Sequence, residues 1–130
     1  MPAKSSPSDR HAQDAYLFDM LESAQHVQQY TANVTFEEFW DDSEKRDAVA
    51  MRLSVIGEAS RHITDKTAAA LPEIPFAQIR GMRNRISHDY RQVNFRTVWQ
   101  VTQEDIAPLV SALMNYFKTH KPPQKSPAKP

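Results

Sequence analysis

The chain has 130 residues, enough for one domain with a single hydrophobic core. It contains no cysteine, which excludes disulfides, thiolate metal ligands and cysteine nucleophiles and fits a reducing compartment. No stretch approaches the roughly 18 consecutive apolar residues of a membrane span, and residues 1–10 lack the apolar run of a signal peptide. We therefore expect a cytoplasmic protein with no membrane association.

The net charge is zero, but the charges are unevenly distributed along the chain. Residues 1–79 hold seven Lys/Arg and thirteen Asp/Glu, a balance of −6, whereas residues 80–130 hold nine and three, a balance of +6. This asymmetry permits a basic surface for a polyanion on an otherwise acidic body. The alternative is that acidic and basic faces pair within the fold or across a dimer.

Two glycines and a clear 3.6-residue periodicity predict an all-α protein. We expect the first helix to begin near Ser8 or Asp9 and to run to about Tyr30. Thr35 and Glu38 have the spacing of a capping box, which predicts a short helix after them. The apolar face of the first helix is marked by Tyr16, Leu17, Met20, Leu21, Ala24 and Val27.

The second long helix is predicted from Asp42 or Ser43 to about Thr64. Glu58 lies beside its apolar stripe, so the carboxylate is expected to be exposed or paired with a cation, because burying it alone is costly. Pairing is the interpretation that we favour over a direct role in a site, and His62, four residues on, is a suitable partner. The buried stripe itself consists of Val49, Leu53, Ile56 and Ile63.

Residues 71–75 break the helical pattern, and Pro75 suits the first turn of the helix that follows. The buried face of that helix is predicted to be Ile79, Met82 and Ile86. Gly81 lies in its interior, where glycine costs about 1 kcal/mol relative to alanine. We expect a close approach of another backbone there, from a neighbouring helix or a second subunit.

The last helix is predicted from about Asn94 to about Lys118, with Pro108 kinking it or starting its second half. Residues 119–130 hold four prolines and three lysines without an apolar stripe, which predicts a disordered basic tail. The expected organisation is a flexible segment over residues 1–9, a helical domain over residues 10–118, and this tail. The domain should be an up-and-down bundle of four or five helices.

Residues 83–90 combine two guanidiniums, an imidazole, a carboxylate and a phenol, groups suited to phosphodiester chemistry. On an ideal helix Arg83 and His88 differ by about 140°, so they would not share a face. The helix could end or distort near Ser87, the arginine could reach around, or two copies could face each other across a dimer. We favour the dimer because Gly81 lies directly upstream. From the residues alone, a cation-rich helix end in which His88 caps carbonyls stays open.

This stretch resembles the signature of the HepT toxins, a family within the HEPN superfamily of small helical RNases. The signature is Arg, four to six residues, His, one residue and Tyr, and it is matched by Arg83, His88 and Tyr90. The resemblance covers about residues 10–118. Asp89 departs from it, because glycine is common between the His and the Tyr; the aspartate removes no reacting group but adds a negative charge beside the site.

The resemblance implies an endoribonuclease that needs neither a metal nor another cofactor. In the implied mechanism His88 takes the proton from a ribose 2′-OH, and Arg83 stabilises the charge that builds on the attacked phosphate. Asn84 would orient the imidazole or a phosphate oxygen. Backbone contacts to the RNA are implied for the nearby arginines Arg80, Arg85 and Arg91.

HepT proteins also pair with a minimal nucleotidyltransferase antitoxin, which transfers AMP to the motif tyrosine, here Tyr90. Each AMP would place bulk and negative charge two residues from His88 and so repel incoming RNA; alternatively, Tyr90 is a core or interface aromatic. The sequence therefore predicts a homodimeric RNase toxin of a toxin–antitoxin pair. The alternative from another class is a non-catalytic module that binds a nucleotide or docks a nucleotidyltransferase.

Overall fold

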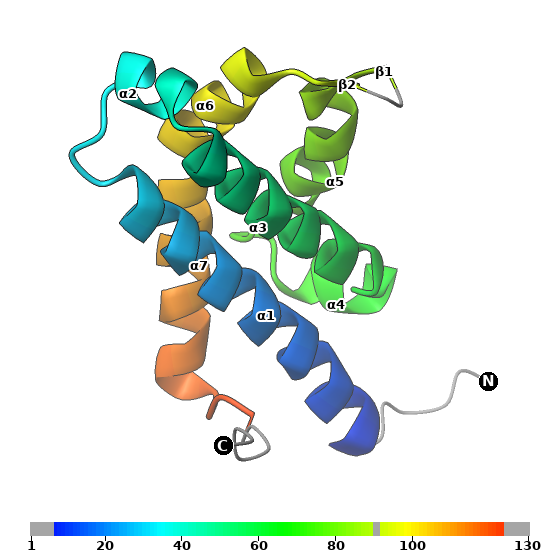
Figure 1. Cartoon of the computed structure of the whole chain (residues 1–130). Helices are drawn as coiled ribbons and strands as arrows, with labels where there is room; N and C mark the ends of the chain where they lie inside the picture. Colours follow the sequence, from blue (N-terminus) through cyan, green and yellow to red (C-terminus); the bar gives the residue numbers. More distant parts are fainter. Residues whose placement is uncertain (1–6, 90–91, 124–130) are drawn as a thin grey trace, which may run out of the picture.

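The computed structural model describes residues 7–89 and 92–123, with only the backbone described at residues 7, 8, 87–89 and 92. The described residues form an all-α bundle with one small hairpin, which confirms the predicted fold class (Figure 1). Five longer helices accompany two helices of six residues each. The elements are α1 Pro7–Thr31, α2 Phe36–Asp41, α3 Ser43–Arg61, α4 Asp65–Ala70, α5 Phe76–Ile86, β1 Ser87–Asp89, β2 Gln92–Val93, α6 Phe95–Glu104 and α7 Ile106–Thr119.

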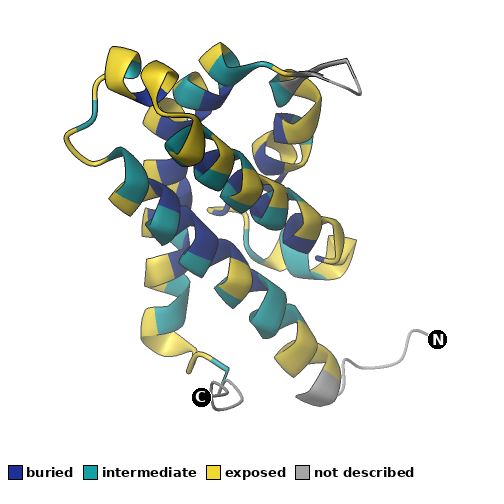
Figure 2. Ribbon diagram, in the orientation of Figure 1, coloured by how far each residue is buried: buried dark blue, intermediate teal, exposed yellow. Residues whose placement is uncertain are grey.

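The hydrophobic core lies between α1, α3 and α7, with α5 and α6 closing it at one end (Figure 1). The buried residues form stripes on the inward faces of these helices, while their outward faces are exposed (Figure 2). Each fully buried aliphatic side chain contributes about 1.5–3 kcal/mol by leaving water. The predicted stripe of α3 is confirmed, because Val49, Leu53, Ile56 and Ile63 are all buried.

Side-chain caps set the start of α2 and α3. Thr35 Oγ1 accepts a hydrogen bond from the Glu38 amide at 3.1 Å, and Glu38 Oε1 accepts one from the Thr35 amide at 3.0 Å. This is the predicted capping box, and the hydrogen bond from the Thr35 backbone lowers the pKa of Glu38 below its ordinary value. Asp42 Oδ1 accepts from the Lys45 amide at 3.0 Å, so Ser43 is the first residue of α3.

Two helix boundaries differ from the sequence prediction. The helix α3 ends at Arg61 rather than near Thr64, and Thr64 instead caps α4, a helix that the periodicity did not indicate. The predicted last helix is divided at Asp105 into α6 and α7. Pro108 lies in the first turn of α7, where its missing N–H is not needed, so it belongs to the start of a second helix rather than to a kink.

A short junction connects α5 to α6 through the β1–β2 hairpin. The Ile86 carbonyl accepts a hydrogen bond from the Asn94 amide at 2.7 Å, which closes the hairpin at the end of α5. The side chain of Asn94 in turn caps α6, because its Oδ1 accepts from the Thr97 amide at 3.1 Å. Residue Asn94 therefore fixes the hairpin to the helices on both sides of it.

The first described helix begins, and the last one ends, near the predicted domain bounds, although α1 begins two residues before the end of the segment predicted to be flexible, and the domain division stays a prediction. The helix α1 begins at Pro7 and α7 ends at Thr119. The predicted flexible N-terminus and basic tail fall largely on residues 1–6 and 124–130, which lie outside the described residues.

Candidate functional site

The Arg-to-Tyr stretch is divided between a helix and a hairpin. Arg83 and Asn84 lie in the last turn of α5, which ends at Ile86, whereas His88 is the middle residue of strand β1. Tyr90 and Arg91 lie outside the described residues. The ideal-helix angle between Arg83 and His88 therefore does not apply. Of the three alternatives given from the sequence, the backbone adopts the first, in which the helix ends near Ser87.

The pairing of the hairpin is irregular at His88. Ser87 pairs with Val93 and Asp89 pairs with Gln92, so β1 advances by two residues where β2 advances by one. The extra residue between the two pairs is His88. Bulges of this kind bend a strand and are over-represented beside active sites, where they re-aim a side chain.

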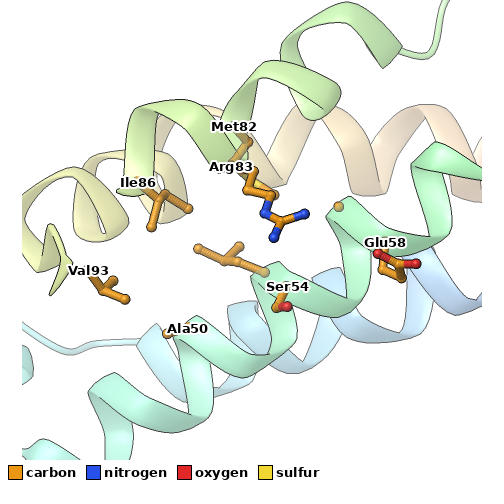
Figure 3. Close-up of a pocket in the computed structure, with 9 residues that line it drawn as sticks. Ala50, Ser54, Glu58, Met82, Arg83, Ile86 and Val93 are labelled. Atoms are coloured by element: carbon orange, nitrogen blue, oxygen red, sulfur yellow. The ribbon is translucent and has the colours of Figure 1, made fainter. Parts of the chain in front are cut away.

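A groove of about 230 Å³ opens beside this junction, between α3, α5 and β2 (Figure 3). The residues at its base are apolar, and the α3 side is lined by small residues that leave space for a ligand. The guanidinium of Arg83 extends from α5 toward α3, with Ser54 and Glu58 on the far side and Val93 at the hairpin end (Figure 3). The lining residues are Ala50, Leu53, Ser54, Gly57, Glu58, Met82, Arg83, Ile86 and Val93.

The two charged residues of the groove differ in their surroundings. Glu58 is 60% exposed and lies 3.5 Å from Arg61 and 3.5 Å from the imidazole of His62, so the predicted pairing of this carboxylate with a cation is confirmed at Arg61. Arg83 is exposed and makes no hydrogen bond or ion pair with any described side chain or backbone group. Its positive charge is thus available to an anion in the groove.

The other predicted arginines have partners within the chain. Arg80 donates a hydrogen bond to the Ile63 carbonyl at 2.8 Å and lies 4.0 Å from Asp65. Arg85 forms an ion pair with Asp105, whose side chain is largely buried. These partners hold Arg80 and Arg85 against the fold, so their predicted contacts with RNA stay predictions.

The close approach of another backbone that we expected at Gly81 is not found among the described residues of this chain. A Cβ atom built at Gly81 would meet no heavy atom within 4 Å, and the same holds at Gly57 in α3. A neighbouring helix of the same chain therefore does not explain Gly81. The second-subunit alternative is still open.

The described residues contain no group of three or more His, Cys, Asp or Glu side chains placed to hold a metal ion. None of the helices in this part of the chain combines the length and the apolar character needed to cross a bilayer.

Sequence reasoning did not single out a second set of arginines near the hairpin. The guanidinium carbon of Arg46 lies 4.9 Å from the ring centroid of Phe95 and 5.7 Å from that of Trp40. That of Arg96 lies 4.9 Å from the ring centroid of Phe36. Spacing could not have indicated these contacts, because Arg46 and Phe95 are far apart in the sequence.

The comparisons with known proteins agree with the family resemblance found in the sequence. Residues 20–116 match the family described as ribonuclease HepT-like. The chain is 35% identical over 92 residues to a protein of Methanocaldococcus jannaschii named as an RNase, covering 71% of this chain and 84% of that one. It is also 35% identical over 94 residues to the probable ribonuclease HepT of Thermococcus cleftensis, covering 72% and 86%.

A bacterial relative extends the match along the chain. The similarity to a protein of Caldanaerobacter subterraneus subsp. tengcongensis, also named as an RNase, is 26% identity over 106 residues, covering 82% of this chain and 95% of that one. No solved structure matches the chain at a significant level. With a family match over most of its length and relatives above 30% identity, the chain belongs to the HepT-like ribonuclease family.

Proposed function

We propose that this protein is a metal-independent endoribonuclease that cleaves RNA by attack of a ribose 2′-OH on the adjacent phosphate. The observation that carries the proposal is Arg83, whose guanidinium has no partner among the described residues and extends into the groove. Arg83 lies four residues before Ser87, the first residue of the bulged strand that contains His88. Membership of a ribonuclease family supports the same reaction. Substrate RNA would occupy the groove between α3, α5 and β2.

The proposed chemistry needs a base and an electrostatic stabiliser. The imidazole of His88 takes the 2′-OH proton, which is efficient because an ordinary histidine titrates near neutral pH. The 2′-oxygen bonds to phosphorus, the P–O5′ bond breaks to leave a 2′,3′-cyclic phosphate, and the departing 5′-oxygen takes a proton from water or from the imidazolium. Arg83 binds the non-bridging phosphate oxygens, and its bidentate fork matches their geometry as negative charge accumulates. Asn84, exposed on the same turn of α5, orients the imidazole or a phosphate oxygen. DNA lacks the 2′-OH and would be bound without being cut.

The proposal extends to regulation by a partner. A minimal nucleotidyltransferase antitoxin transfers AMP to the Tyr90 hydroxyl, which makes the protein the toxin of a cytoplasmic toxin–antitoxin pair. The support is the position of Tyr90 two residues after His88 in the motif, where an added phosphate would repel an RNA phosphate.

We also infer a homodimer in which the two hairpin regions face each other. The open face of α5 at Gly81 supports this arrangement, because no atom of the described residues lies within 4 Å of a Cβ built there. Two basic stretches would then lie close together, and bound RNA would supply the anion that offsets their repulsion.

The test is cleavage of an unstructured RNA in excess EDTA by protein free of contaminating nuclease. His88→Ala should lower the rate about 10²- to 10⁴-fold, and Arg83→Ala about 10²- to 10³-fold. Both variants should keep the wild-type circular dichroism spectrum and thermal midpoint. Matched controls are His11→Ala and Arg10→Ala on the exposed start of α1, which should cleave as wild type does.

The possible results separate the mechanism from its alternative. If His88→Ala cleaved RNA at the wild-type rate, the proposed mechanism would be wrong. No cleavage by wild type, combined with tight binding of a nucleotidyltransferase, would instead favour the non-catalytic docking module.

A further inference from the structure

A cluster of aromatic and arginine side chains lies at the end of the molecule that carries the hairpin. It is formed where α2, the start of α3 and the start of α6 meet, and in Figure 1 these elements lie at the same end of the molecule as the hairpin, with α6 between α2 and β2. We call it the aromatic–arginine patch. It consists of Phe36, Trp40, Arg46, Phe95 and Arg96.

The aromatic part of the patch presents a ring to solvent. Trp40 is 46% exposed, although Phe39 beside it on α2 is fully buried. The rings of Phe36 and Trp40 are 5.7 Å apart, and Phe36 also contacts Trp99 at 6.0 Å, so the exposed ring rests on half-buried ones. Trp40 is therefore held in place without being covered. The capping box of α2 fixes the helix from which it projects.

The arginines of the patch are held by rings rather than by acids. Arg46 stacks on Phe95 and Trp40, and Arg96 stacks on Phe36. Neither guanidinium forms a hydrogen bond or ion pair with another described residue, and Nε of Arg46 is buried without a partner. Stacking leaves the N–H edges of a guanidinium free to bind an anion. Two positive charges are thus fixed in place and not neutralised by the described part of the chain.

An exposed ring combined with stacked, unpaired arginines suits one kind of ligand. Single-stranded nucleic acids bind to such platforms, with bases stacked on aromatic or guanidinium planes and phosphates on the arginines. A role in core packing alone explains the half-buried rings but not the exposure of Trp40. It also leaves the missing ion pairs of Arg46 and Arg96 unexplained.

The patch is continuous with the proposed RNA groove. Val93 lines the hairpin end of the groove, and Phe95 follows it by two residues at the start of α6. The Asn94 amide between them is bonded to the Ile86 carbonyl, so groove and patch are joined by a short, fixed segment. A strand that leaves the groove past Val93 reaches the patch next.

We propose that the aromatic–arginine patch binds the single-stranded RNA that flanks the cleaved bond, with a base stacked on Trp40 and phosphates on Arg46 and Arg96. This inference rests on the proposed ribonuclease function and adds a second contact region for the same substrate. It assigns to these residues substrate binding, not chemistry.

The surroundings of the patch limit how far the strand can follow it. The outer face of α2 and the first turn of α3 carry exposed carboxylates, which repel phosphates. RNA affinity should therefore rise with RNA length only until the strand reaches Trp40, and longer RNA should gain no further affinity from this region. These carboxylates are Glu37, Glu38, Asp41, Asp42 and Glu44.

The experiment measures RNA affinity in the His88→Ala background, where the RNA stays intact. Labelled oligouridylates of about 4 to 16 nucleotides, the range covered by single-strand binding folds, are titrated by fluorescence anisotropy. Trp40→Ala should weaken binding of the longest RNA about tenfold and leave that of the shortest unchanged. Trp40→Phe should restore most of the loss. The matched control is Met114→Ala, a similarly exposed apolar residue on α7 (48%), which should have no effect at any length.

A second measurement reads the contact directly. Trp40 and Trp99 are the only tryptophans of the chain, so Trp99→Phe leaves Trp40 as the sole reporter. Long RNA should quench its fluorescence, whereas short RNA should not. A thermal midpoint for each variant checks that the fold is retained.

The inference and the underlying function fail in different ways. Equal affinity of Trp40→Ala and Met114→Ala for long RNA, with wild-type cleavage intact, would overturn the patch alone. The same would follow if Trp40→Ala weakened association with a protein partner but not with RNA. If wild type neither cleaves nor binds RNA of any length, both the function and the patch are rejected.

Discussion

Six of the nine arginines divide into two groups by what surrounds each guanidinium. Arg61, Arg80 and Arg85 have carboxylate partners within the chain. Arg83, Arg46 and Arg96 have none among the described residues, and the last two are held over rings instead. Because a paired guanidinium must lose a partner before it binds a phosphate, the unpaired group is the better candidate for substrate contact.

The sequence identified only part of this division. Arg83, His88 and Tyr90 could be selected because their spacing is a motif in one segment of chain. The partners of Arg80 and Arg85 are Asp65 and Asp105, and no local pattern connects residues so far apart. The RNA-binding role assigned to Arg80 and Arg85 from their position near the motif is therefore the weakest part of the sequence-based prediction.

The first prediction concerns a single group, the hydroxyl of Tyr90, as the acceptor of AMP. After co-expression with a cognate nucleotidyltransferase, the intact mass should rise by whole AMP units, and the gain should disappear in Tyr90→Phe. Tyr30→Phe, a half-buried tyrosine of α1, should still gain the mass. Mass spectrometry of the intact protein decides the matter, and modification that persists in Tyr90→Phe would place the acceptor elsewhere.

At the scale of elements, the helices follow from periodicity and the hairpin does not. Apolar spacing gave the buried faces of α1, α3 and α5 correctly because each helix contacts the core along one stripe. The residues after Ile86 continue to resemble a helix, and the loop sequence Tyr90–Arg91 lacks the Asn-Gly or Asp-Gly signal of a tight hairpin. Pairing between β1 and β2 ends the helix there, and such pairing is set by tertiary structure rather than by local propensity.

The junction residue Asn94 gives a prediction at this scale. Asn94→Ala removes the cap of α6 and should lower the free energy of unfolding by about 1 kcal/mol. The variant keeps the backbone amide of residue 94, which bonds to the Ile86 carbonyl, and loses only the side-chain bond to the Thr97 amide. It should also lower RNA cleavage, because the freed first turn of α6 directly follows the hairpin that carries His88. Urea denaturation and cleavage rates measure the two effects.

A matched cap variant separates stability from function. Thr64→Ala removes the cap of α4, away from the hairpin, and should cost a similar free energy while cleavage stays at the wild-type rate. If both variants reduced cleavage equally, the effect would come from stability alone and the junction would have no specific role.

At the scale of the whole molecule, the glycine beside the motif has no explanation inside a single chain. Gly81 lies in the interior of α5, where alanine would be more favourable, and no heavy atom of the described residues blocks a Cβ there. Gly57 is equally open, but it lines the groove on α3. In a monomer Gly81 would therefore lower the stability of α5 relative to alanine without any compensating contact. A second subunit packed against α5 beside the motif supplies the missing reason, and it would bring two proposed sites together.

Gly81→Ala tests this assembly. In dilute solution, where the monomer dominates, the variant should be more stable than wild type by about 1 kcal/mol, because alanine favours the helix. At high concentration the added methyl group should obstruct the contact, so sedimentation equilibrium should show weaker dimerisation. Gly57→Ala in α3 is the control for helix propensity, since its Cβ position is equally open. A variant at Gly81 that gains stability and dimerises as wild type does would show that α5 does not form the subunit contact at this position.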